Sequence, residues 1–107
     1  MRLRTAIAAL ALFYSAASFA QSAPPPVGNW QSQSNEILSV SPNGYCEFGI
    51  NGTYTTYGAC SWNATARGGV LTIINVTTYK PAPVYFNVQW IDNDTISVFG
   101  DTFYRQK

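Results

Sequence analysis

Histidine is missing from this 107-residue chain, and charge is scarce, with six Lys and Arg and five Asp and Glu side chains. Without histidine, neither a Ser-His-Asp triad nor a Cys-His pair can form, and the ordinary zinc sites lose a principal ligand. The few basic residues form no patch for nucleic acid and no polybasic strip for anionic lipid. We therefore expect no metal, no cofactor and no nucleic-acid partner.

A pair of carboxylates is the remaining route to acid–base catalysis. Asp92, Asp94 and Asp101 fall in predicted turns, where Asp commonly caps its own backbone. Strand alternation turns Glu47 outward, and Glu36 precedes a strand, so the pattern does not bring the two glutamates together. Two turn carboxylates also fall short of the six to eight oxygens that calcium prefers. We expect no catalytic residue, and a binding protein in place of an enzyme.

The first 20 residues, MRLRTAIAALALFYSAASFA, have the three parts of a secretory signal: early arginines, an apolar run and a small-residue ending. The apolar run is too short for a membrane helix of about 20 residues. No cysteine lies near the expected cut, so we expect no membrane anchor. We predict that residues 1–20 are removed and that the protein is periplasmic or secreted. The remainder has four basic and five acidic residues, a net charge of −1.

Cys46 and Cys60 are the only cysteines, and in an exported chain an even pair predicts a disulfide. A redox or metal-binding pair is disfavoured because no CxxC spacing and no histidine accompany it. Closing a loop of this size stabilises a domain by about 3 kcal/mol.

The predicted disulfide conflicts with the strongest turn signal in the chain, Asn51 and Gly52. A two-residue turn there would place Cys60 opposite Asn43, not opposite Cys46. Either the loop is longer, spanning residues 51–55, or the tight turn holds and the bond crosses a strand kinked near Gly58. We expect the longer loop, with Tyr54 at its tip.

After a proline-rich stretch the pattern is β almost throughout, with apolar residues at every second position and frequent turn residues. Eight short strands joined by tight turns are antiparallel neighbours, and such a sheet avoids exposed edges by closing. We predict an all-β fold, a small antiparallel up-and-down barrel, with a two-sheet β-sandwich as the second choice. Residues 21–27 are expected to form a flexible Pro-rich arm and residues 28–107 a single barrel domain.

The domain opens with GNW at Gly28 to Trp30 and carries Arg105 on its last strand. This resembles the lipocalin and calycin pattern, in which a C-terminal arginine packs over the tryptophan of a G-x-W motif. The resemblance implies that Arg105 closes one end of the barrel over Trp30. In size and signal the chain is also similar to small periplasmic inhibitors of secreted metalloproteases. In that family a flexible N-terminal arm enters the protease cleft.

Few charges and many tyrosines fit a protein partner met by the outer surface, and they fit equally well a wet sheet face on which Tyr and Thr simply form strands readily. We predict an exported, monomeric, non-enzymatic binding protein, an inhibitor or immunity-type factor whose partner is a secreted or lytic enzyme. The alternative is a lipocalin-like carrier of a small apolar ligand, although inward rings at Phe48, Trp62, Phe86 and Trp90 occupy that volume. The candidate partner-binding residues lie in the arm, in the loop TYKPAPVY and at the predicted hairpin tip: Pro24, Pro25, Pro26, Tyr79, Lys80, Pro81 and Tyr54.

Overall fold

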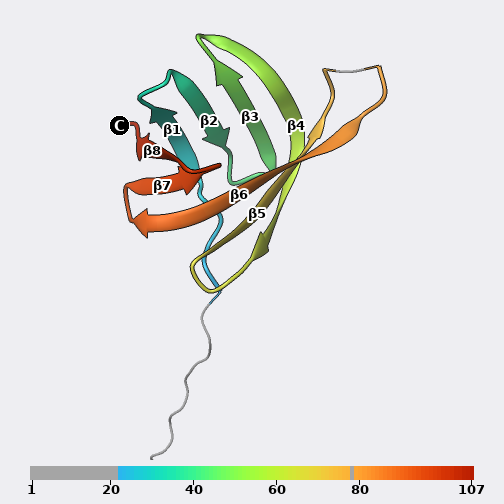
Figure 1. The fold of residues 1–107 in the computed structure, drawn as a ribbon. Coiled ribbons are helices and arrows are strands. Elements are labelled where there is room, and N and C mark those ends of the chain that lie inside the picture. Colours follow the sequence, from blue (N-terminus) through green and yellow to red (C-terminus); the bar gives the residue numbers. More distant parts are fainter. Residues whose placement is uncertain (1–21, 78) are drawn as a thin grey trace, which may run out of the picture.

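A computed structural model of the chain describes residues 22–77 and 79–107; the expected signal segment, Gln21 and Thr78 lie outside the described residues. Each strand pairs antiparallel with the next, and the last pairs with the first, so the sheet closes into a barrel (Figure 1). This confirms the predicted up-and-down barrel over the sandwich. The strands are β1 (Gly28–Ser32), β2 (Glu36–Val40), β3 (Tyr45–Ile50), β4 (Thr53–Ala64), β5 (Gly68–Asn75), β6 (Ala82–Asp92), β7 (Thr95–Val98) and β8 (Asp101–Arg105).

The connections between strands alternate between two ends of the barrel, because successive strands run in opposite directions. We call one the arm end, formed by residues 23–27, 41–44, 65–67 and 93–94. The other is the turn end, formed by residues 33–35, 51–52, 76–77, 79–81 and 99–100. Among the described residues, no helix has the length and apolar character needed to cross a membrane.

Side chains fill the interior of the barrel. On β6, Phe86 and Val88 are buried and Val84 and Trp90 pack against the core, which is the inward face that alternation predicts. Since large rings occupy the middle, the interior is a packed core. The buried apolar residues are Trp30, Leu38, Val40, Cys46, Leu71, Ile73, Phe86, Val88, Ile96, Val98 and Phe103.

The hairpin of β3 and β4 keeps its tight turn and also forms the disulfide. Ile50 pairs with Thr53, and the turn residues Asn51 and Gly52 have positive φ angles of 54° and 82°. The expected longer loop over residues 51–55 is therefore wrong. A bulge between Phe48 and Gly49 shifts the register by one residue. A larger shift would be needed to place the two cysteines directly opposite each other.

The predicted disulfide is confirmed, and a kink at Gly58 makes it compatible with the tight turn. Cys46 pairs with Gly58, yet its bond is to Cys60, with 5.7 Å between the Cα atoms. Gly58 has a φ of 154°, and a Cβ there would overlap the carbonyl oxygen of Ile74. From Cys60 onward β4 pairs with β5 instead of β3. The second alternative, a bond across a kinked strand, is the one that the fold adopts.

The ribbon of β5 and β6 runs beyond the rest of the barrel and carries its connecting loop outward (Figure 1). Pairing of β6 with β7 begins only at Val88, so the part of β6 before it presents a free edge. Pro83 lies on this edge, and proline offers no N–H to an added strand. The loop with Tyr79 therefore stands at the tip of a projecting hairpin.

Candidate functional site

The stretch of residues 23–27, which the sequence predicts to belong to a flexible arm, lies against the arm end of the barrel. All three tryptophans of the chain point their indole N–H groups at it, from β1, β4 and β6. These donors form a row along the carbonyl groups of the segment. Trp62 Nε1 donates to Ala23 O, Trp90 Nε1 to Pro24 O and Trp30 Nε1 to Pro26 O, each at 2.9 Å.

The other backbone polar groups of residues 23–27 are paired as well. Val27 N donates to Pro25 O at 2.8 Å within the segment, and Ala23 N donates to Thr65 O at 2.9 Å. The Val27 carbonyl accepts from Arg105 Nη1 at 2.9 Å. Prolines have no N–H, so none of the five carbonyls or two N–H groups is left without a partner. The segment is therefore part of the folded domain.

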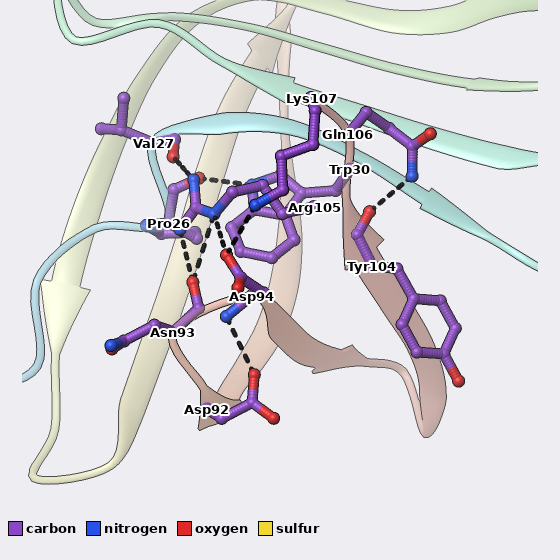
Figure 2. Close-up of polar contacts among 10 residues, drawn as sticks. All are labelled: Pro26, Val27, Trp30, Asp92, Asn93, Asp94, Tyr104, Arg105, Gln106 and Lys107. Carbon is purple, nitrogen blue, oxygen red and sulfur yellow. Dashed lines mark hydrogen bonds and ion pairs between the residues drawn. The ribbon is translucent and has the colours of Figure 1, made fainter.

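Arg105 closes the arm end (Figure 2). Its guanidinium lies 4.4 Å from the ring centre of Trp30, the geometry of a cation–π contact. Nη2 donates to Asn93 O at 2.7 Å, and Nε lies 3.1 Å from Asp94 Oδ1. One side chain therefore joins β8 to the segment before β1 and to the β6–β7 turn, as the lipocalin resemblance implies.

Gly28 explains why the G-x-W pattern begins with glycine. Its φ is 135°, a value that other residues rarely adopt, and a Cβ would come within 2.7 Å of Arg105 Nη1. A side chain at this position would force the guanidinium to shift.

The three prolines predicted to bind a partner differ in exposure, because residues 23–27 lie against the barrel. Pro26 is less than 2 % exposed, whereas Pro24 and Pro25 are exposed. An open pocket of about 390 Å3 lies beside Pro24 and is lined also by Ser22, Arg67, Trp90, Asp92 and Asn93. In this position Pro26 faces the barrel and is inaccessible to a partner.

The remaining predicted partner-binding residues belong to two connections at the opposite, turn end. Tyr54 follows the β3–β4 turn and is 45 % exposed, and Tyr79 on the β5–β6 loop is 97 % exposed. Lys80 and Pro81 continue the same loop and are exposed. The Thr77 hydroxyl donates to Thr55 O at 3.4 Å, which ties the start of this loop to β4 beside Tyr54.

Phe99 also lies at the turn end, and the sequence did not single it out. It forms the two-residue β7–β8 turn with Gly100, with φ angles of 54° and 81°, and it is 59 % exposed. A positive φ on a bulky residue is rare and strained. The ring is tilted against that of Phe86 in the core, with 5.3 Å between the ring centres, and the rest of it is in solvent.

A polar cluster lies at the same end, where β1, β2 and β8 meet. The buried Ser32 hydroxyl lies 3.2 Å from Glu36 Oε1 and accepts from the N–H of Glu36. Burial, and then a hydrogen bond and the charge of Asp101, raise the pKa of the Glu36 carboxyl above its ordinary value. Among the described residues no group of three or more His, Cys, Asp or Glu could hold a metal ion. Sequence reasoning missed this pair of acids because it assigned Asp101 to a turn.

The fold and its two ends define a small closed β-barrel with one disulfide, one end sealed by its own N-terminal segment and the other lined with exposed aromatic side chains. Comparison with protein-family models, with curated proteins and with solved structures finds no match to this chain.

Proposed function

We propose that the chain is an exported binding protein that engages a protein partner through the turn end of its barrel, as an inhibitor or immunity-type factor. The observation that carries the proposal is Phe99, a large ring held half in solvent on a strained turn. Strain of this kind persists where the surrounding structure enforces it, and it concentrates at functional sites.

Two further aromatic residues at the turn end suit a protein partner. Tyr54 and Tyr79 are exposed at the same end, and we call these three residues the rim aromatics. Exposed aromatic side chains on a rigid scaffold bind with little loss of entropy and are common anchors of interfaces. A disulfide-linked barrel provides such a scaffold.

The architecture also supports an inhibitor-like role by resemblance. The closed barrel, the G-x-W start and the arginine over the tryptophan resemble the small exported inhibitors named above. The arm that such inhibitors insert into a protease is here docked on its own barrel, so the turn end is the better candidate surface. The packed interior favours a protein partner over a small apolar ligand carried inside the barrel.

Site-specific crosslinking in the exporting cell tests the proposal. A photo-crosslinking amino acid replaces Tyr79 in one variant, Tyr54 in a second and, as a control, the exposed Tyr45 in a third, which begins β3 beside the arm end. We expect the same protein, identified by mass spectrometry, to crosslink from both rim positions and not from Tyr45. Equal crosslinking from Tyr45, or none from the rim positions, would contradict the proposal.

A further inference from the structure

We infer that the arm end is a binding site for proline-rich peptide segments, and that the chain fills it with its own residues 23–27. This inference concerns the end of the barrel opposite the rim aromatics and does not depend on the proposed function. The ligand chemistry is visible directly, because the segment Ala-Pro-Pro-Pro-Val is seated on the site.

Among the described residues, the barrel side chains that are hydrogen-bonded to the segment all act as donors. Three indole N–H groups and one guanidinium point at the carbonyls of the segment, and the one acceptor, Thr65 O, lies at Ala23 before the prolines. An ordinary residue in place of the buried Pro26 would bring an N–H group into a part of the site where Trp30 and Arg105 can only donate. Proline at this position removes the N–H group and keeps the carbonyl. The hydrogen-bond chemistry of the site therefore favours a segment with proline at the buried position.

The donors also pack against parts of the barrel other than the segment. Trp30 and Trp90 pack edge to face, with ring centres 5.7 Å apart. Trp62 lies against Gly69, where a Cβ would come within 2.8 Å of its ring. Indole donors fixed on three strands form a preorganised surface, which lowers the entropic cost of binding an extended proline-rich chain.

The chain's own segment competes with any external ligand. Being covalently attached, it acts at a high effective concentration, so an external peptide binds only in proportion to the fraction of chains whose arm is released. Weakening the arm without changing the three tryptophans should therefore increase binding of a peptide in trans.

Pro26→Ala in the full chain is the variant that achieves this. It adds an N–H group at a position that is less than 2 % exposed, which should disfavour docking of the arm roughly tenfold to a hundredfold. Pro25→Ala is the matched control, because Pro25 is exposed and its carbonyl bonds only within the segment. The ligand is a dye-labelled peptide, Ser-Ala-Pro-Pro-Pro-Val-Gly, followed by fluorescence anisotropy.

We expect the Pro26→Ala chain to bind this peptide at least about tenfold more tightly than the unchanged chain, and the Pro25→Ala chain to resemble the unchanged one. A peptide with alanines in place of prolines should not bind, and adding Trp62→Phe to the Pro26→Ala chain should weaken binding about tenfold. Equal affinities across the variants, or equal binding of the alanine peptide, would overturn the inference. If the Pro26→Ala chain does not fold alone, the peptide must restore its β-sheet circular dichroism signal. A chain that stays unfolded at millimolar peptide also overturns the inference.

Discussion

Replacing Phe99 by glycine and by alanine measures the strain of the β7–β8 turn. Both variants remove the ring and its packing on Phe86, so the difference between them reports on the backbone alone. Phe99 has a φ of 54°, in the left-handed region. Glycine adopts this region freely, whereas alanine is destabilised there by its Cβ.

The magnitude follows from two opposing terms. The left-handed conformation costs alanine about 1 to 2 kcal/mol, and glycine avoids this cost. Glycine instead loses more backbone freedom on folding, by about 0.4 to 1 kcal/mol. We therefore expect the Phe99→Gly chain to be more stable than the Phe99→Ala chain by about 1 kcal/mol. For a domain of this size that difference corresponds to about 4 to 8 °C in Tm.

The matched control is Tyr85 on β6, which is 60 % exposed and lies in a strand without a positive φ. There the order should reverse, with the alanine variant more stable than the glycine variant by about 0.5 to 1 kcal/mol. Urea unfolding followed by tryptophan fluorescence gives both differences. The same sign at Phe99 and Tyr85 would refute the argument that the turn is strained.

Four further changes test other contacts. Gly58→Ala should cost about 2 kcal/mol or more in thermal unfolding, because its Cβ overlaps a carbonyl oxygen, while Gly52→Ala, in open space, should cost about 1 kcal/mol; equal losses would contradict this. Deleting residues 22–27 removes four hydrogen bonds from barrel side chains and should lower the free energy of unfolding by about 4 kcal/mol; an unchanged urea midpoint would count against docking. The pKa of the Glu36 carboxyl is raised in the folded chain. Between its ordinary pKa of about 4.3 and this raised pKa, the folded chain binds more protons than the unfolded chain, so stability falls as the pH rises from the first value to the second. Glu36→Gln should therefore be more stable than the unchanged chain at pH 7 and equal to it below pH 4, and urea midpoints that coincide at pH 7 would disprove this. Arg105→Lys keeps the charge but loses the planar stack and the forked donors, so it should lower Tm measurably, and calorimetry showing no shift would exclude the closing role.

The barrel could be predicted because the sequence signals that specify it, alternation and turn residues, are local. Apolar residues alternate with polar ones on each strand, and turn residues separate the strands, so strand number and order follow from the pattern alone. The register near the disulfide could not be predicted in this way. It depends on a bulge at Gly49 and on the contact between Gly58 and Ile74, which lies on another strand. Tertiary contacts of this kind leave no periodic trace in the sequence.

The arm end shows a different limit of sequence reasoning. Trp30, Trp62 and Trp90 lie on β1, β4 and β6, and only barrel closure brings their indoles to one segment. Proline-rich composition by itself predicts an extended, mobile arm. It does not indicate that the indole N–H groups of the barrel bind the carbonyl groups of the arm. The available clue to this docking was that the strand pattern places three tryptophans near one end of the barrel.

Phe99 was missed because alternation extends β7 by one residue and assigns the turn to Gly100 and Asp101. In the structure β7 ends at Val98, and Phe99 occupies a turn position that asparagine or glycine prefers. The β3–β4 turn of the same chain uses Asn51 and Gly52 at the equivalent positions, with nearly the same φ angles. Packing of the Phe99 ring on Phe86 offsets part of the cost of this unfavourable turn residue. The packing leaves much of the ring in solvent, and we propose that this exposed part contacts a partner at the turn end.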